Sequence, residues 1–126
     1  MTRRQVLAVG TVGVFLVASP VFGHHTWAVD RTREVTVTGT ITGFNWSNPH
    51  VEIFLDAKDE KGNVEKWTAG GPSTGRVAGK GWDRNLLRAG DIITAVGYRA
   101  TDGSRLLRVE ALTLSTGQRL ALYADR

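Results

Sequence analysis

Cysteine is absent from this chain of 126 residues. Without a thiol the protein has no disulfide, no thiolate metal site, no cysteine nucleophile and no cysteine for lipid attachment. The sequence also lacks a phosphate-binding loop and a dinucleotide-binding fingerprint. These absences favour a non-enzymatic role, and they require that any metal site be built from nitrogen and oxygen ligands.

Long hydrophobic runs are also scarce, and the one clear apolar stretch lies at the amino terminus. It runs from Val6 to Ala18 and follows the basic pair Arg3 and Arg4. Because a membrane-spanning helix needs about 20 apolar residues, this stretch is short for an anchor and suits a signal peptide. We expect residues 1–23 to be a leader, cut between Gly23 and His24; an uncleaved anchor is the alternative.

Export carries further expectations about location and domain organisation. The mature chain, residues 24–126, is expected to form a single β-barrel domain in the periplasm or outside the cell, with no stable membrane anchor after cleavage. The two arginines also resemble a twin-arginine signal, so the general and twin-arginine export routes both stay open.

Positive charge is in small excess over negative charge. The formal net charge is +4, and removal of the leader with its two arginines would lower it to +2. Export and this weak electrostatic attraction together predict that nucleic acid is not a partner. An unidentified periplasmic protein or small ligand is the expected partner instead.

Short segments rich in Thr, Val and Ile predict an all-β protein. A first strand interrupted by Gly39 and Gly43 is expected to bend or bulge at its glycines. The strands are expected at residues 35–46, 50–57, 64–69, 91–100 and 105–114, with a short edge strand in 118–123. A helical connector is expected near residues 73–80, between strands three and four. This order predicts a small five- to six-stranded OB-like barrel, with a β-sandwich as the rival.

Several short motifs resemble those of a known family. They are His24-His25-Thr26-Trp27, Asn48-Pro49-His50-Val51, Gly81-Trp82, Leu87-Arg88-Ala89-Gly90-Asp91 and Val96-Gly97-Tyr98-Arg99-Ala100. From His24 to about Leu114 the chain resembles a family of small exported bacterial proteins known only as a domain of unknown function (family 6152). The resemblance implies a signal peptide and a barrel-type β domain, and it implies no catalytic residues.

The three histidines fall in two of these motifs. Cleavage after Gly23 would free the α-amine of His24, and an amino-terminal histidine chelates copper through that amine and its ring. A further imidazole, from His25 or His50, would complete a three-nitrogen site suited to Cu(II) in tetragonal geometry. Copper, or another transition metal, is thus the candidate cofactor. The alternative is that His24 and His25 are solvated and that His50 only begins a strand.

Four tryptophans are many for so short a chain. Aromatic side chains on a barrel face can stack a sugar or a base, which makes Trp27, Trp46, Trp67 and Trp82 candidate ligand-binding residues. The alternative is that these rings fill the core and the rim of a small barrel. Three functional hypotheses follow: a metal-binding accessory module, an aromatic-faced module that binds a small ligand or protein without metal, and a small metal-dependent redox enzyme.

Overall fold

The computed structural model describes residues 27–123. Polar and apolar residues alternate along most of the strands, which is the pattern of a sheet with one buried face. The elements in chain order are β1 (Val29–Asn45), β2 (Glu52–Lys58), β3 (Val64–Gly70), α1 (Thr74–Ala78), β4 (Ile92–Ala100), β5 (Leu106–Thr113) and β6 (Arg119–Ala121).

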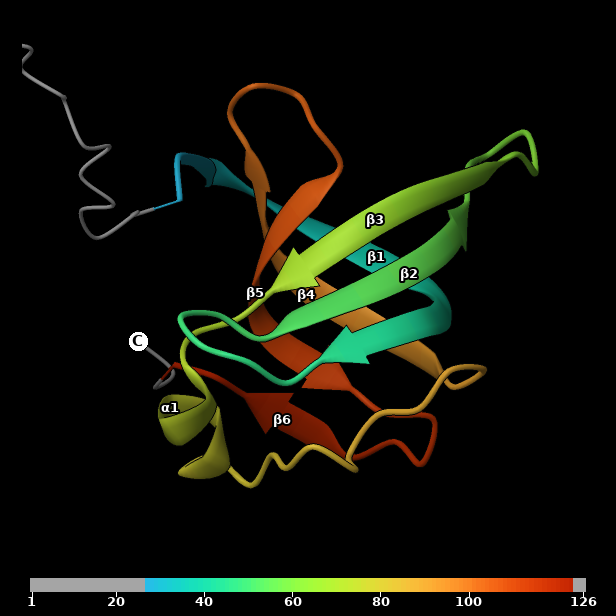
Figure 1. Ribbon diagram of the computed structural model, residues 1–126. Coiled ribbons are helices and arrows are strands. Elements are labelled where there is room, and N and C mark those ends of the chain that lie inside the picture. The colour runs from blue at the N-terminus through green and yellow to red at the C-terminus, as the bar shows by residue number, and fades with distance from the viewer. Residues whose placement is uncertain (1–26, 124–126) are drawn as a thin grey trace, which may run out of the picture.

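The strands close on themselves. They follow the order β3-β2-β1-β4-β5-β6, and an additional parallel pairing of β3 with β5 joins the two sides. In Figure 1 the strands wrap around a common centre, with α1 at the lower left. A closed barrel of β1 to β5, with its helix between β3 and β4, confirms the predicted OB-like fold over the β-sandwich.

β1 pairs with a strand on each of its two sides. Its first half pairs with β4 and its second half with β2, and the register with β2 shifts between Ile41 and Gly43. At Gly39 a Cβ atom would lie 2.6 Å from the main-chain oxygen of Asp56, so the two strands approach closely there. The predicted irregularity is confirmed at Gly43, whereas Gly39 is a point of close backbone contact.

The core lies inside this barrel. Alternate strand residues point inward, and the largest fully buried side chains are Ile41, Ile53, Leu55, Ile93, Leu107, Leu112, Leu122, Val51, Val77 and Val109. Val77 is the one buried residue of α1. This short helix therefore closes one end of the barrel with a single aliphatic side chain.

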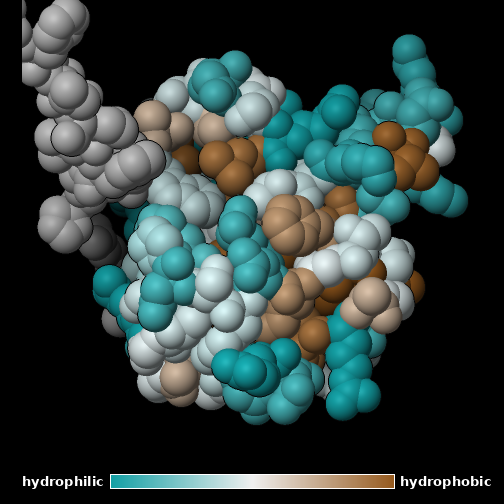
Figure 2. All heavy atoms as spheres, viewed as in Figure 1, coloured by the Kyte–Doolittle hydropathy of each residue, from teal (hydrophilic) through white to brown (hydrophobic). Residues whose placement is uncertain are grey.

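The two ends of the barrel carry different connections. The β1–β2 connection and α1 lie together at the lower left of Figure 1, whereas the β4–β5 and β2–β3 loops lie at the top and upper right. Figure 2 shows hydrophilic residues over the β2–β3 loop and hydrophobic residues reaching the surface near the middle of the face. Within residues 27–123, no helix is both long and apolar enough to span a membrane.

Candidate functional site

The β1–β2 connection, residues 46–51, is fastened to the segment that leads into α1. Asn48 Oδ1 accepts hydrogen bonds from the N–H and the hydroxyl of Thr74, each at 3.0 Å. The Val51 N–H donates to the carbonyl of Pro72 at 3.0 Å, and the Val51 carbonyl accepts from the Gly71 N–H at 2.9 Å. Bonds at both of its ends hold the connection in place, including the histidine between them.

The ring of His50 has a fixed orientation. Its Nδ1 lies 3.0 Å from the carbonyl oxygen of Gly71. Because a carbonyl oxygen only accepts hydrogen bonds, Nδ1 carries the proton and Nε2 of the neutral ring keeps its lone pair. Metal-binding histidines are oriented in this way, by donating the other ring N–H to a backbone carbonyl or a carboxylate. His50 therefore presents Nε2 as a possible metal ligand.

Trp27 packs against the same histidine. The two ring centroids are 5.2 Å apart and the rings meet edge to face at 74°. The indole lies over Gly70, where a Cβ atom would be 1.5 Å from Cη2 of the ring. Glycine at position 70 therefore makes the slot that Trp27 fills.

The predicted metal ligands are divided between two parts of the chain. His24, His25 and the expected leader lie outside the described residues, whereas His50 lies within them. No three His, Cys, Asp or Glu side chains come together as a possible metal site within residues 27–123. A copper site at His50 thus depends on ligands from the amino-terminal segment.

Ser73 stands close to this site, and sequence reasoning set it aside as a nucleophile because it overlooked the spacing of the glycines around it. The stretch Gly71-Pro72-Ser73-Thr74-Gly75 has the Gly-x-Ser-x-Gly spacing of a hydrolase nucleophile elbow and joins a strand to a helix. Ser73 is instead the N-cap of α1: its φ and ψ are −63° and 158°, and its side chain accepts from the Arg76 N–H. Ordinary extended backbone and a capping bond give Ser73 a structural role.

The four tryptophans are unequally exposed. Trp67 and Trp82 are 8% and 3% exposed, so core side chains cover most of both rings. Trp46 is half-buried against the core, and its ring centroid lies 6.0 Å from that of Phe44. Trp27 is also half-buried. Of the four, Trp27 and Trp46 keep the most surface for contact with a ligand.

Phe54 offers an aromatic surface that sequence reasoning did not single out. It is 38% exposed on the outer face of β2, beside Gly43 of β1, where a Cβ atom would lie 3.3 Å from the ring. A hollow of about 300 Å³ is lined by Thr42, Phe54, Leu55, Asp56, Lys66, Trp67 and Thr68. The alternation along β2 could have indicated this exposed ring, because it puts Phe54 on the same face as Glu52 and Asp56.

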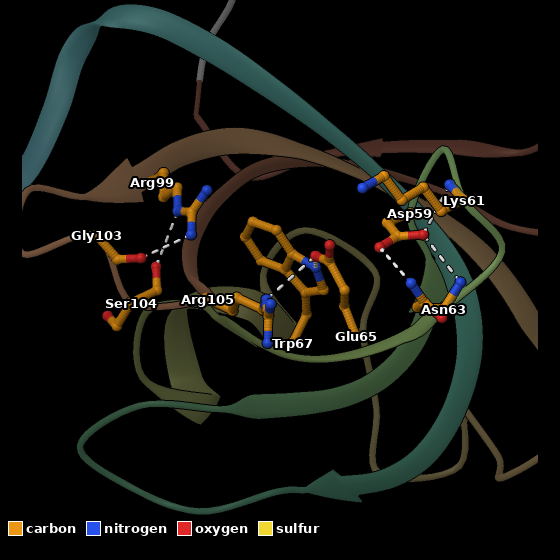
Figure 3. A network of polar contacts seen from close by, with 9 residues as sticks. All are labelled: Asp59, Lys61, Asn63, Glu65, Trp67, Arg99, Gly103, Ser104 and Arg105. Atoms are coloured by element: carbon orange, nitrogen blue, oxygen red, sulfur yellow. Dashed lines mark hydrogen bonds and ion pairs between the residues drawn. The ribbon is translucent and has the colours of Figure 1, made fainter.

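Arg99 connects the end of β4 to the β4–β5 loop, as Figure 3 shows. Its Nε donates to the Ser104 carbonyl at 3.0 Å and its Nη2 to the Gly103 carbonyl at 2.6 Å. The guanidinium also lies 5.1 Å from the ring centroid of Trp67, a cation–π contact. The β4–β5 loop and the core are thus joined through one arginine.

Glu65 binds the polar edge of the Trp67 ring. Its Oε2 accepts from the indole Nε1 of Trp67 at 3.2 Å and lies 3.1 Å from Nε of Arg105. The polar edge of a largely buried tryptophan is therefore satisfied at the rim of the barrel.

Comparison with solved structures supports the fold. A crystal structure of the mitochondrial single-stranded DNA binding protein Rim1 from S. cerevisiae superposes with a TM-score of 0.50 and 10% sequence identity. The match covers 66% of this chain and 93% of that one. Identity this low shows a shared fold and nothing finer.

The likeness corrects one prediction. Nucleic acid was excluded as a partner on grounds of charge and export, although the barrel type often binds it. A solved protein with a similar barrel is a single-stranded DNA binding protein, so the prediction that excluded nucleic acid is wrong.

Comparison with known sequences gives the family. No curated protein matches the chain. The model of the Family of unknown function (DUF6152) matches residues 12–107, which is most of the chain and includes the β1–β2 connection and strands β1 to β4. The chain therefore belongs to the Family of unknown function (DUF6152).

Proposed function

We propose that the protein is an exported binding module that holds Cu(II) between its released amino terminus and His50. The observation that carries the proposal is the bond between His50 Nδ1 and the Gly71 carbonyl, which directs the proton to Nδ1 and leaves Nε2 for a metal. His24 would supply its α-amine and its ring, and His25 is the alternative second imidazole.

The position of Trp27 supports this arrangement. Its ring touches that of His50, and His24 precedes it by three residues. Since an extended chain spans about 3.3–3.6 Å per residue, three residues reach about 10 Å. The amine of a mature chain that begins at His24 is therefore within reach of His50.

The proposed ligands suit copper at neutral pH. An α-amine has an unperturbed pKa of about 7.7–8.0, so a metal displaces its proton near neutrality. Amine and imidazole nitrogens favour Cu(II) among the common divalent ions.

Titration of Cu(II) into the processed protein tests the proposal. We expect His50→Ala to weaken binding at least about tenfold and to change the copper spectrum, because even the loss of a residue that orients a metal ligand costs 10–100-fold. Any peptide that begins His-His binds some Cu(II), so a synthetic peptide of residues 24–30 is the reference. If His50→Ala binds like the parent and both bind like the peptide, the folded protein contributes no ligand.

The redox-enzyme hypothesis is separated from this one by turnover. A module that only stores or delivers copper binds the ion without consuming a substrate, whereas an enzyme shows multiple turnovers per copper. Oxygen consumption by the copper-loaded protein with a reductant, compared with His50→Ala, distinguishes the two.

A second candidate function is binding of single-stranded nucleic acid on the outer face of β2 and β3. Phe54 favours it, because an exposed ring beside Lys66, Thr42 and Thr68 suits base stacking with adjacent polar contacts. A titration with a thymidine oligomer at several salt concentrations tests it, and Phe54→Ala should lower affinity at least about fivefold, since stacking is worth about 1–3 kcal/mol per base. Ile92→Ala, which trims an exposed side chain on β4, is the matched control.

A further inference from the structure

β1 departs from regular pairing near its start. Val29 pairs with Ala100 and Glu34 with Tyr98, so residues 30–33 stand opposite Arg99 alone. The carboxylate of Asp30 accepts hydrogen bonds from the N–H and the hydroxyl of Thr32, which stabilises the bulged conformation. Bulges in strands often redirect side chains next to functional sites.

The bulge and the β4–β5 loop border an open hollow of about 520 Å³. Its apolar wall comes from Val29, Val35 and Ala100, and its charged wall from Arg31, Arg33 and Arg99. The Thr101 N–H donates to the Ala28 carbonyl at 3.0 Å and ties the loop to the start of β1. The volume lies within the ~300–1,000 Å³ range of small-molecule sites, and both walls are fixed by hydrogen bonds.

Charge in the hollow favours an anion. Three arginine residues line it against one acidic residue, Asp30, whose carboxylate already accepts hydrogen bonds from Thr32. Arg99 is held in a defined place by two loop carbonyls, through Nε and Nη2, and by the Trp67 ring. Arg31 and Arg33 are exposed on the bulge and can fold over a bound group. An ordered guanidinium flanked by two movable ones suits an oxyanion.

We propose that this hollow, the arginine site, binds a small organic anion. The phosphate or carboxylate head would contact Arg31, Arg33 and Arg99, and the apolar body would pack against Val29, Val35 and Ala100. The proposal is independent of copper, because none of these residues contributes to the His50 site.

Calorimetric titrations with n-butyl phosphate, n-pentanoate, inorganic phosphate and n-butanol test the site. We expect the phosphate monoester or the carboxylate to bind more tightly than inorganic phosphate, because only the organic anions bury an apolar body, and we expect no binding of butanol. The Arg31→Gln/Arg33→Gln double variant should weaken anion binding at least about tenfold, because it removes two of the three guanidinium groups that would contact the head group. Whichever of phosphate and carboxylate binds better identifies the head group.

Arg119→Gln is the matched control, because Arg119 is an exposed arginine on β6 outside the hollow. Arg99→Gln disturbs the contact with Trp67, so it is interpreted only if its circular dichroism and melting temperature match the parent. The proposal fails if no anion binds the intact protein, or if the double variant binds as well as Arg119→Gln. It also fails if a thymidine oligomer binds through these arginines while butyl phosphate does not, because the occupant is then a polymer.

Discussion

The histidine end and the arginine site differ in the kind of ligand that their side chains favour. At the histidine end (Trp27, His50, Gly70 and Gly71) the ring of His50 is oriented by a backbone carbonyl and flanked by an indole. At the arginine site, three guanidinium groups surround an open hollow. A neutral nitrogen donor suits a metal cation and a guanidinium suits an oxyanion, so the two sites favour ligands of opposite charge.

The histidine end and the arginine site also differ in the hydrogen bonds that fix their loops. Backbone bonds between Val51 and the segment at Gly71 and Pro72 fix the β1–β2 connection, with the neutral amide of Asn48 as a further acceptor. Carboxylates shape the loops of the arginine site instead: Asp30 accepts from Thr32 and Asp102 from Ser104. We therefore expect the arginine site to respond to acid and the histidine end to respond to packing.

The largest effect is expected from a change in the pairing of β4 with β5. At Gly97 of β4 a Cβ atom would lie 1.9 Å from the main-chain oxygen of Arg108 on β5. Gly97→Ala must separate these strands, so we expect it to lower the free energy of unfolding by about 3 kcal/mol and to weaken both copper and anion binding. Urea denaturation followed by tryptophan fluorescence measures the loss.

Gly75→Ala is the control for that change. Gly75 lies in α1 with no neighbouring atom within 4 Å of the added Cβ. Alanine is favoured over glycine in a helix by about 1 kcal/mol, so this variant should be as stable as the parent or slightly more stable. Equal urea midpoints for Gly97→Ala and Gly75→Ala would contradict the expected strand separation.

A smaller effect is expected at the histidine end alone. Gly70→Ala places a methyl group where the Trp27 ring lies, so we expect a loss of about 1–3 kcal/mol in stability. Copper binding should weaken more than butyl phosphate binding, because Trp27 contacts His50 directly and is linked to the arginine site only through Ala28, whose carbonyl accepts from the Thr101 N–H. Parallel titrations of the two ligands measure this separation.

The same pair of residues allows a stricter test. Trp27→Ala removes the ring that the added methyl group would meet, so Gly70→Ala should cost little further stability in that background. Additive losses in the double variant would show that the two positions do not share a slot.

The smallest effect is expected at the arginine site in acid. Hydrogen bonds from Thr32 lower the pKa of Asp30 below its ordinary value of 3.8, and those from Ser104 lower the pKa of Asp102 in the same way. A lowered pKa means that the ionised carboxylate favours the folded loop. Its contribution is complete above pH 3.8 and is lost as the pH falls through the lowered value.

We therefore expect the amide signals of Thr32 and Ser104 to shift together with acid titration below pH 3.8, before the barrel unfolds. The amide signal of Thr74 should not shift, because its N–H donates to Asn48, which has no ionisable group. A Thr74 signal that moves with the other two would show that acid acts on the whole barrel instead of on one end.

The sequence predicted most of the strands because polar and apolar residues alternate along them, as exposed and buried side chains do in the structure. The prediction began the first strand at Val35, whereas β1 begins at Val29. Residues 30–34 are exposed and polar, so they show no alternation of polar and apolar residues from which a strand could be predicted. They belong to β1 because Val29 and Glu34 pair with β4. The predicted helix of residues 73–80 is shorter in the structure, Thr74–Ala78, since Gly79 is its C-cap.

The amino-acid sequence by itself determined the OB-like barrel, through strand periodicity and the order of three strands, a helix and two further strands. It also marked His50 as a residue to examine, because its three histidines fall in only two motifs.

Only the tertiary structure decided what His50 and the aromatic residues can do. Burial of Trp67 and Trp82, exposure of Phe54, and the meeting of Trp27 with His50 and Gly70 depend on contacts between residues far apart in the chain. The arginine site likewise joins the start of β1 to the β4–β5 loop, about 70 residues later, through pairing of two strands. A local pattern specifies which face of a strand is buried, whereas closure of the barrel specifies which side chains share a site.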